Sequence, residues 1–428
     1  MSTIRITPPD GDLNAEIRVP GSKSVANRAL VCAMLANGES TISGIPDGDD
    51  TAVILRVLRD VSRLHELRPD AFVVAGDPQG KLPHIIDAQL AGTSSRFMTA
   101  VAALSSDMRI IDGGAPLRAR PMNDLHVALQ QLGAEITPLG DIGHLPISVS
   151  KGTCRGGEVS IRGDVSSQFI SALMLIGPVL EEGISIRIEG HLVSRSYVEM
   201  TATVMRAFGA DVNISDAEIS VRSTGYVASD YVVEPDFSSA AFPLVATVLR
   251  PGVVRIPHLG LSTMQGDSEV LTILRSMGLD VEQTTTDVVV RHADGSQLQP
   301  ISFDMSDCSD LVPAIAVACT AINGVSTISG VGFIRHKESD RLGDLAAELT
   351  KCGADVRVDD DGLTITGGRP LVDAVFETHH DHRLAMALSL CSLTSGTSSL
   401  QNYEVVSKSW PSFFDDLAPI LGPVVVGN

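Results

Sequence analysis

Apolar helical segments recur along the chain at nearly even intervals, and a loop rich in Ser, Thr or Asp opens each of them. The six helix openings follow one another at intervals of 71 to 73 residues, and they lie near Ser22, Thr93, Ser166, Ser238, Ser309 and His382. Self-similarity at a fixed period indicates a repeated structural unit. This period is too long for a solenoid repeat and is typical of a small α/β unit.

Within a repeat, the apolar helix leads into an alternating strand, a second helix and a pair of strands. The first helix is predicted over about 24–36. Its N-cap is Ser22 or Lys23 and Ser24, and Gly38 stops the helix from continuing. Alternating strands are predicted over 41–43, 108–111, 184–188, 253–256 and 327–329. The clearest hairpin joins 356–358 to 363–365. The unit therefore reads βαβαββ.

Four of the second helices end in the same way, with a glycine between apolar residues. These glycines are Gly133, Gly209, Gly278 and Gly353. A glycine just after a helix can adopt the left-handed conformation that closes the last turn. The shared ending supports one fold for all repeats.

Six such units exceed what one hydrophobic core can hold, so three units are expected in each of two domains. No Pro-, Gly- or Ser-rich linker marks a boundary, and an even division falls near 231–236. A strand over 4–6 precedes the first repeat. It could complete the second domain, which would make the connection between the domains double.

Composition narrows the classes of partner. The chain has 428 residues and a formal net charge of -20, which argues against nucleic acid and anionic membranes because both need a basic face. An anionic substrate remains possible if a few Lys and Arg residues gather in one site. The first 11 residues lack the apolar core of a signal peptide, and the apolar run 311–322 is too short to span a bilayer. The six cysteines show no C-x-x-C spacing, which favours a reduced, cytoplasmic protein.

The first helix opening carries the strongest chemical signal. Helix N-termini bind anions, and here Lys23 and Ser24 start the helix while Arg28 follows five residues after the lysine. All three side chains can reach a phosphate or carboxylate at the helix start. The segment is not a Walker A loop, because Ser22 separates Gly21 from the lysine and the upstream glycine is missing.

The second opening follows the same logic. Gly92 would let a ligand approach backbone N–H groups closely. Further along, Arg118 and Arg120 precede a helix whose first residue is predicted to be Pro121. Since Arg is a bidentate partner for carboxylate and phosphate, these residues are candidate anion ligands.

The third and fourth openings have hydroxyl groups without bases. Ser166, Ser167 and Gln168 can hydrogen-bond to hydroxyls and phosphate oxygens. Ser238 and Ser239 occupy the same place in the fourth repeat, where they are predicted to be plain helix caps. Position in the repeat alone therefore does not define a site.

The segment 335–341 is dense with charge, and a solvated helix start is the usual outcome for such a run. However, Lys337 and Arg341 have the spacing of neighbours on one helix face. Glu338 is a candidate general acid, and Asp310, at the start of the fifth repeat helix, is a candidate base. Because cations surround both carboxylates, the pattern leaves their acid and base roles open.

Two further segments have competing interpretations. The run His-His-Asp-His at 379–382 suggests a metal site, but these side chains cannot all face one ion on a turn, and the sequence has no second ligand cluster. An anion site centred on Arg383 is favoured instead. Lys408 is an isolated base and is expected on the surface.

Taken together, these segments resemble the 5-enolpyruvylshikimate-3-phosphate (EPSP) synthase family. The matching segments are Pro20 to Ser24, Leu90 to Thr93, Arg120-Pro121, Ser166 to Gln168, Lys337 to Arg341 and Asp381 to Arg383. The match as a whole covers all six repeats in order. The chain departs from the common family pattern at Leu90, Phe97 and Phe333, among others.

The resemblance implies an α/β fold of two domains, each with three βαβαββ units around a pseudo-threefold axis. The domain at 21–233 would carry most of the shikimate-3-phosphate contacts. The domain formed by 1–20 and 234–428 would carry Asp310, Glu338 and several phosphoenolpyruvate contacts. The N-terminal strand would belong to the second domain.

The resemblance also implies the ligand contacts. Those to shikimate-3-phosphate would be Lys23, Ser24, Arg28, Ser166, Ser167, Gln168, Ser194, Tyr197, Asp310 and Lys337. Those to phosphoenolpyruvate would be Lys23, Gly92, Arg120, Gln168, Arg341, Arg383 and Lys408. Glyphosate competes with phosphoenolpyruvate in this family, so sensitivity to it is expected.

The implied reaction is an addition–elimination. The 5-hydroxyl of shikimate-3-phosphate attacks C2 of phosphoenolpyruvate while C3 is protonated, and the tetrahedral intermediate then loses phosphate. By resemblance, Asp310 accepts the hydroxyl proton, Glu338 supplies the proton to C3, and Lys23 takes part in either transfer. No cofactor and no metal are expected, and the enzyme is expected to be a monomer.

Three rival functions differ from this expectation in sequence features. The enolpyruvyl transferases that act on UDP-N-acetylglucosamine usually have Asn after the lysine and a reactive Cys in a mobile loop, whereas here Ser24 follows Lys23 and the segment 113–120 has no Cys. An RNA-end-processing enzyme built from similar repeats is disfavoured by the net charge of -20. A non-catalytic anion-binding protein would need no carboxylates among its bases.

Overall fold

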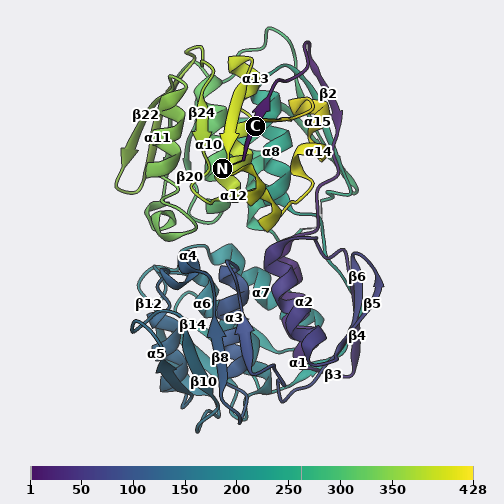
Figure 1. The fold of residues 1–428 in the computed structure, drawn as a ribbon, viewed down its shortest axis with the longest axis vertical. Coiled ribbons are helices and arrows are strands. Elements are labelled where there is room, and N and C mark those ends of the chain that lie inside the picture. The colour runs from purple at the N-terminus through teal and green to yellow at the C-terminus, as the bar shows by residue number, and fades with distance from the viewer. Residues whose placement is uncertain (1, 262, 428) are drawn as a thin grey trace. The chain divides into compact units, whose positions relative to one another are not determined.

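The computed structural model describes residues 2–261 and 263–427, and the chain divides into two compact units (Figure 1). One unit is continuous and runs from Gly21 to Glu234. The other combines the residues up to Pro20 with those from Pro235 onward. The chain therefore leaves and re-enters the second unit, and each unit is described separately below.

The continuous unit contains three four-stranded sheets and a short strand pair among its described residues. The first sheet has the order β16 (Tyr231–Val232), β4 (Glu39–Ser43), β6 (Ala71–Ala75), β5 (Leu64–Arg68). The second has the order β7 (Ile85–Asp87), β8 (Arg109–Asp112), β10 (Ile147–Ser150), β9 (Glu135–Pro138). The third has the order β11 (Gly157–Arg162), β12 (Ile184–Glu189), β14 (Glu218–Val221), β13 (Val212–Ile214). Strand β15 (Tyr226–Val227) pairs with β3 (Ala36–Asn37).

The discontinuous unit repeats this plan in its described residues. Its first sheet has the order β2 (Leu13–Glu16), β17 (Gly252–Pro257), β19 (Asp287–His292), β18 (Asp280–Gln283). The next has the order β20 (Ser302–Asp304), β21 (Gly324–Ser329), β23 (Gly362–Gly367), β22 (Asp355–Asp359). The last has the order β24 (Val375–Glu377), β25 (Ser398–Gln401), β1 (Thr3–Ile6), β26 (Val425–Gly427).

Each four-stranded sheet among the described residues uses the same pairing. The first two strands are parallel, as in β7 with β8, and a helix must therefore connect them where they are consecutive. The last two strands form an antiparallel pair, as in β9 with β10, and a second helix precedes that pair. Each repeat is thus a βαβαββ unit, and the predicted fold class of two domains with three such units each is confirmed.

Two strands from the N-terminus complete sheets whose other strands come from far along the chain. β2 lies parallel to β17, and β1 lies antiparallel to both β25 and β26. In the last sheet Ile4 faces Leu400 on one side and Val426 on the other. In Figure 1 the purple N-terminal segment accordingly lies among the green and yellow elements.

The helices fall into an inner and an outer class. Six helices bury nearly all of their residues: α1 (Lys23–Leu35), α3 (Gly92–Ala102), α6 (Ser167–Ile176), α8 (Phe237–Leu249), α10 (Val312–Ala321) and α12 (His382–Ser389). The amphipathic helices are α2 (Asp49–Asp60), α5 (Asn123–Gln131), α7 (Arg195–Ala207), α9 (Glu269–Ser276) and α11 (Gly343–Lys351). Helices that are apolar all round belong in a core, so the inner helices form the centre of each unit.

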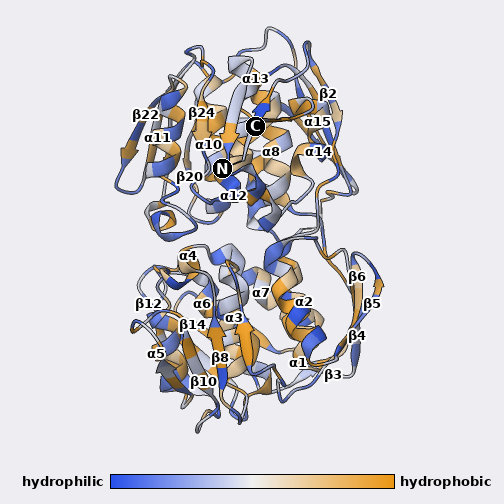
Figure 2. Ribbon diagram, viewed as in Figure 1, coloured by the Kyte–Doolittle hydropathy of each residue, from blue (hydrophilic) through white to orange (hydrophobic). Residues whose placement is uncertain are grey.

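Shorter helices complete the connections. The α-helical ones are α4 (Ala115–Arg118), α13 (Ser392–Ser395), α14 (Phe413–Asp416) and α15 (Ala418–Leu421). The 3₁₀ helices are η1 (Gly177–Val179), η2 (Gly266–Ser268), η3 (Ser309–Leu311), η4 (Gly332–His336) and η5 (Tyr403–Lys408). Figure 2 shows hydrophobic residues in both units rather than in one of them. No helix in the described residues is long and apolar enough to cross a membrane.

The four predicted glycine endings have the expected geometry. Gly133, Gly209, Gly278 and Gly353 all have φ between 81° and 99°. After each of them the next N–H donates to a carbonyl five residues earlier, as Ala134 does to Leu129 at 3.0 Å. This is the Schellman motif, which satisfies carbonyls that the helix itself leaves without donors.

The first helix runs from Lys23 to Leu35, within one residue of the predicted range at each end. It ends at Leu35 because Ala36 leaves the helix to pair with Tyr226 in a parallel strand. The prediction for the helix after Arg120 was wrong. Pro121 is not the first residue of its helix: α5 begins at Asn123, and Pro121 lies in the turn between α4 and α5.

A buried histidine makes the stability of the continuous unit pH-dependent. His126 lies in α5 with 4% of its surface exposed, and burial, with a smaller effect of His144, lowers its pKa to about 4. The unfolded chain, with a His pKa of about 6.5, binds the proton better, so folding is favoured fully above pH 6.5 and less as the pH falls towards 4. We expect His126→Gln to reduce the pH slope of the unfolding free energy between about pH 6.5 and 4, by up to about 1.4 kcal/mol per pH unit. Denaturant titrations at several pH values measure this slope, and equal slopes for both proteins would contradict the assignment.

Candidate active site

In the continuous unit, the start of α1 carries an ion pair. Lys23 is the first residue of α1, and its Nζ lies 2.9 Å from Oδ2 of Asp50. Asp50 lies in the first turn of α2, where a carboxylate interacts favourably with the helix dipole. The carboxylate side chain is 3% exposed and the lysine side chain 15% exposed. The pair thus holds a cation at a helix N-terminus with limited access to water.

Arg28 is more deeply buried than the sequence suggested. Its Nε donates to Thr201 Oγ1 at 2.7 Å, Nη1 to the Ser24 carbonyl at 2.8 Å, and Nη2 to Ser171 Oγ and the Tyr197 carbonyl. Only 1% of the residue is exposed, and burial lowers its pKa to about 10. A substrate could accept a hydrogen bond only from the second Nη1 hydrogen, because protein groups accept from the other guanidinium hydrogens.

A second group forms around the start of α3. A Cβ added to Gly92 would lie 2.6 Å from Nη1 of Arg120 and 2.6 Å from Nη1 of Arg96. The same Nη1 of Arg96 donates to Oε1 of Gln168 at 3.0 Å. Since an arginine can only donate, the amide oxygen of Gln168 faces Arg96 and its NH₂ group faces elsewhere. Gly92 therefore keeps two guanidinium groups close to a helix N-terminus.

The remaining candidates of this unit lie at two other helix starts. Ser166 caps α6 and its Oγ accepts from the Gln168 backbone N–H, while Ser167 is 6% exposed. Ser194 precedes α7 with φ of 54°, in the left-handed region, and is 3% exposed. Tyr197 is half-buried in the first turn of α7.

In the discontinuous unit, three cations share the carboxylate of Asp310. Oδ1 accepts from Lys337 Nζ at 3.2 Å and from Arg341 Nη1 at 3.0 Å, and Oδ2 accepts from Arg383 Nη2 at 2.7 Å. Asp310 belongs to η3, which leads into α10, whereas Arg383 lies in the first turn of α12. The structure thus brings together residues that are more than 70 positions apart in the sequence.

Arg341 connects this carboxylate to two others. Its Nη2 donates to Glu338 Oε2 at 2.7 Å and its Nε to Asp381 Oδ2 at 2.7 Å. Lys408 Nζ donates to the other oxygen of Glu338 at 2.8 Å. Burial by itself lowers the pKa of Arg341, but the three carboxylates outweigh it and raise that pKa above its usual value.

We call these seven residues the carboxylate–cation cluster: Asp310, Lys337, Glu338, Arg341, Asp381, Arg383 and Lys408. Four of them are cations and three are carboxylates, so the cations exceed the carboxylates by one. Such an arrangement can bind an anion, and it holds two carboxylates, Asp310 and Glu338, that remain 14% exposed on their side chains. An anion that takes over the cations would release these two carboxylates for proton transfer.

Three predictions in this unit were wrong. Lys337 and Arg341 do not share a helix face, because the segment between η4 and α11 is not helical; they converge through Asp310 instead. Lys408 is not on the surface but is 5% exposed and paired with Glu338. Ser238 is not the cap of α8. Asp236 fills that place, and Ser238 accepts a hydrogen bond from Arg383.

Several residues of the site were not found from the sequence. Asp381 and Asp50 are acids at helix starts, which the sequence shows, but the sequence does not show that they pair with Arg341 and Lys23. Phe97 and Phe333, two positions at which the chain departs from the family pattern, also lie close to cations of the site. The Phe97 ring lies 5.4 Å from the guanidinium of Arg28, and the Phe333 ring lies 5.7 Å from Nζ of Lys337. Aromatic faces attract cations at these distances.

The run of histidines at 379–382 has other partners than a metal. His379 Nε2 lies 2.8 Å from Glu348 Oε1, and His382 is buried beside Asp381, with its Nδ1 3.7 Å from Oδ1. Within the ranges 2–261 and 263–427, no group of three or more His, Cys, Asp or Glu side chains could hold a metal ion.

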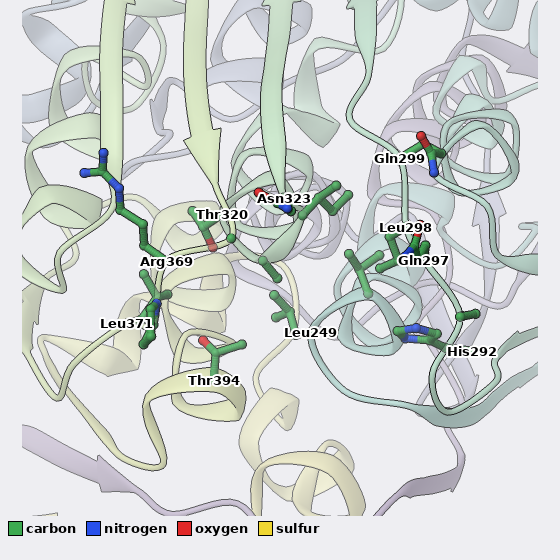
Figure 3. A pocket seen from close by; sticks show the side chains of 16 residues that line it. Leu249, His292, Gln297, Leu298, Gln299, Thr320, Asn323, Arg369, Leu371 and Thr394 are labelled. Atoms are coloured by element: carbon green, nitrogen blue, oxygen red, sulfur yellow. The ribbon is translucent and has the colours of Figure 1, made fainter.

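Two pockets, one in each unit, are lined by residues other than the candidates. A pocket of about 670 Å³ lies where α8 and α10 end, and Figure 3 shows Arg369 and Leu371 on one side of it and Gln297 and His292 on the other. A pocket of about 620 Å³ lies at the C-terminal side of α3 and α6 in the other unit. Both occur at the ends of inner helices opposite the candidate residues. Since both pockets lie at the C-terminal ends of inner helices, we attribute them to the packing of the repeats.

Known proteins resemble the chain over nearly its whole length. The sequence model of EPSP synthase (3-phosphoshikimate 1-carboxyvinyltransferase) matches residues 8–417. A 3-phosphoshikimate 1-carboxyvinyltransferase of Methanothermobacter thermautotrophicus is 38% identical over 407 residues, which cover 94% of this chain and 95% of that protein. One from Photobacterium profundum is 33% identical, with 97% of this chain and 98% of that protein covered. The solved EPSP synthase of Acinetobacter baumannii superposes with a TM-score of 0.83 at 26% identity, with 100% of each chain covered.

The buried pair of Arg341 and Asp381 should be important for stability. Asp381 is 0% exposed, and its removal would leave a buried guanidinium without one of its carboxylates. We expect Asp381→Ala to lower the free energy of unfolding by about 3–5 kcal/mol. The exposed pair Arg5–Asp373 is a matched control, and Asp373→Ala should change it by less than about 1 kcal/mol. Denaturant unfolding of both variants measures this, and equal losses would contradict the special role of Asp381.

Proposed function

The chain belongs to the EPSP synthase (3-phosphoshikimate 1-carboxyvinyltransferase) family, and we propose that Asp310, Glu338 and Lys23 carry out the proton transfers of its reaction. It transfers the enolpyruvyl group of phosphoenolpyruvate to the 5-hydroxyl of shikimate-3-phosphate and releases phosphate. This is a step in the synthesis of chorismate and the aromatic amino acids. The observation that best supports the proposal is the carboxylate–cation cluster.

Phosphoenolpyruvate is bound by cations that pair with carboxylates of the carboxylate–cation cluster. Arg341, Arg383 and Lys408 donate to its carboxylate and phosphate oxygens, in place of their bonds to Asp310 and Glu338. The other contacts are Lys23, Gly92, Arg120 and the NH₂ group of Gln168. Gly92 is required because a Cβ there would meet the guanidinium groups of Arg120 and Arg96.

Binding of the anion changes the electrostatic environment of the two carboxylates. With Lys337, Arg341 and Arg383 shared with a substrate anion, Asp310 interacts less strongly with each cation and becomes a better proton acceptor. Asp310 then takes the proton of the 5-hydroxyl as its oxygen attacks C2. Once Lys408 and Arg341 donate to the substrate anion instead of to Glu338, this carboxylate takes up a proton from water and gives it to C3. Lys23, paired with Asp50, assists either transfer.

Shikimate-3-phosphate is bound chiefly by hydroxyl groups and cations of the continuous unit. The proposed contacts are Lys23, Ser24, Arg28, Ser166, Ser167, Gln168, Ser194 and Tyr197, with Asp310 and Lys337 from the other unit. Arg28 contributes through the one Nη1 hydrogen that remains, because Ser24, Ser171 and Tyr197 accept from the other three Nη hydrogens. The Phe97 ring lies 5.4 Å from the guanidinium carbon of Arg28 and attracts its charge.

The proposed substrate contacts are divided between the two units. We assign most shikimate-3-phosphate contacts to the unit Gly21–Glu234, and Asp310, Glu338 and several phosphoenolpyruvate contacts to the other. We further propose a monomeric cytoplasmic enzyme. All six cysteines are free and buried, which is consistent with a reducing compartment.

The assignment of Asp310 can be tested with an isosteric change. Asp310→Asn keeps the shape and removes the proton acceptor, so we expect kcat to fall by about 10²–10⁴-fold. Asp307→Asn, at an exposed carboxylate three residues earlier, is the matched control and should leave kcat unchanged. Steady-state release of phosphate measures both variants. Turnover of Asp310→Asn close to that of the control would show that another group accepts the proton.

A further inference from the structure

A tight turn carries Asp381 into the carboxylate–cation cluster. The turn spans 378–381 and is closed by the Asp381 N–H, which donates to the Thr378 carbonyl at 2.8 Å. Its two central residues, His379 and His380, have φ of 49° and 56°. Residues other than glycine rarely adopt this left-handed conformation, so the surrounding structure must hold the turn in place.

Of the two central residues of this turn, His379 is the one whose side chain is anchored. Its Nε2 lies 2.8 Å from Oε1 of Glu348, a carboxylate of α11 that is 2% exposed. A carboxylate accepts only, so Nε2 carries the proton of this hydrogen bond. The carboxylate is itself fixed, because it also accepts from Lys351 Nζ and from the backbone N–H of Glu377 at 2.9 Å. On the other side of the ring, Nδ1 lies 3.6 Å from Oδ1 of Asp344.

The next residue along the turn provides a contrast. His380 has nearly the same backbone conformation, but its side chain is exposed, whereas that of His379 is half-buried. The sequence therefore places two histidines at equally unfavourable positions, and the structure ties the first of them to a buried carboxylate. The anchoring is thus a property of the His379 side chain and not of the turn in general.

The turn orients two cations of the cluster through Asp381. Asp381 Oδ2 accepts from Arg341 Nε at 2.7 Å, and Oδ1 accepts from the backbone N–H of Arg383 at 2.9 Å. The same carboxylate thus holds one guanidinium directly and caps the helix on which the other is mounted. A shift of the turn would move both cations together.

We propose that His379 is a positioning residue for phosphoenolpyruvate: its hydrogen bond to Glu348 holds the turn that places Asp381, and through Asp381 it sets the positions of Arg341 and Arg383. His379 touches no reacting atom in this mechanism. The inference rests on the proposed function of these two arginines as ligands of phosphoenolpyruvate. It adds a residue of α11, Glu348, and a residue of the turn to the parts of the chain on which the site depends.

Three variants of the full-length protein test the proposal. His379→Asn suits the left-handed backbone but is too short to reach Glu348, whereas His379→Gln places an amide N–H near the original Nε2. His380→Asn is the matched control. We expect His379→Asn to raise KM for phosphoenolpyruvate about tenfold with kcat changed by less than about threefold, because misplaced ligands weaken binding more than chemistry. His379→Gln should restore most of the affinity, and His380→Asn should behave as wild type.

The outcomes separate a positioning role from a merely structural one. A lower thermal midpoint of His379→Asn with unchanged KM would overturn the proposal, as would equal effects of His379→Asn and His380→Asn or a failure of His379→Gln to rescue. Arg383→Lys tests the underlying assignment. If it raises KM for phosphoenolpyruvate while His379→Asn does not, the inference fails and the proposed function stands. If neither variant changes KM, both the inference and the role of Arg383 are wrong.

Discussion

The discontinuous unit depends on one interaction above all, the burial of the Arg341 guanidinium. A charge that is 1% exposed is tolerated only when carboxylates and hydrogen bonds replace its water. Asp310, Glu338 and Asp381 supply them, and they come from three different segments of the chain. The same requirement that makes the fold stable therefore assembles two carboxylates among cations. The proposed catalytic groups and the structural partners of Arg341 are therefore, in part, the same residues.

The repeated unit explains why much of the polar chemistry lies near helix starts. The inner helices bury nearly every residue, and their charged residues lie within the first two turns. N-terminal N–H groups favour anions at those places. Lys23, Gly92 and Ser166 open helices of one unit, while Asp310 and Arg383 lie at the helix starts of the other. Aromatic rings also contact two of the cations: the Phe97 ring lies against Arg28, and the Phe333 ring lies against Lys337.

Local patterns predicted the repeated fold well, and long-range contacts limited the prediction of the site. Strand positions and the four glycine endings depend on short-range periodicity and backbone conformation, which a single sequence displays. The burial of Lys408 and the link between Ser238 and Arg383 depend on residues 70 and 145 positions away, for which spacing gives no signal. Lys337 and Arg341 do meet, but at Asp310 rather than on a helix, so the helical spacing was a coincidence. The family resemblance supplied the candidate residues, and the geometry shows which of them contact one another.

The central claim is that Glu338, released by Arg341 and Lys408 when they bind the substrate anion, donates the proton to C3 of phosphoenolpyruvate. The most direct measurement is the rate at which deuterium from D₂O enters C3 in the presence of shikimate-3-phosphate, followed by NMR or mass spectrometry. The account predicts ready incorporation by the wild-type enzyme and a loss of at least about 100-fold for Glu338→Gln, the lower range for a general acid. Incorporation by Glu338→Gln at the wild-type rate would contradict the account, because another group would then deliver the proton.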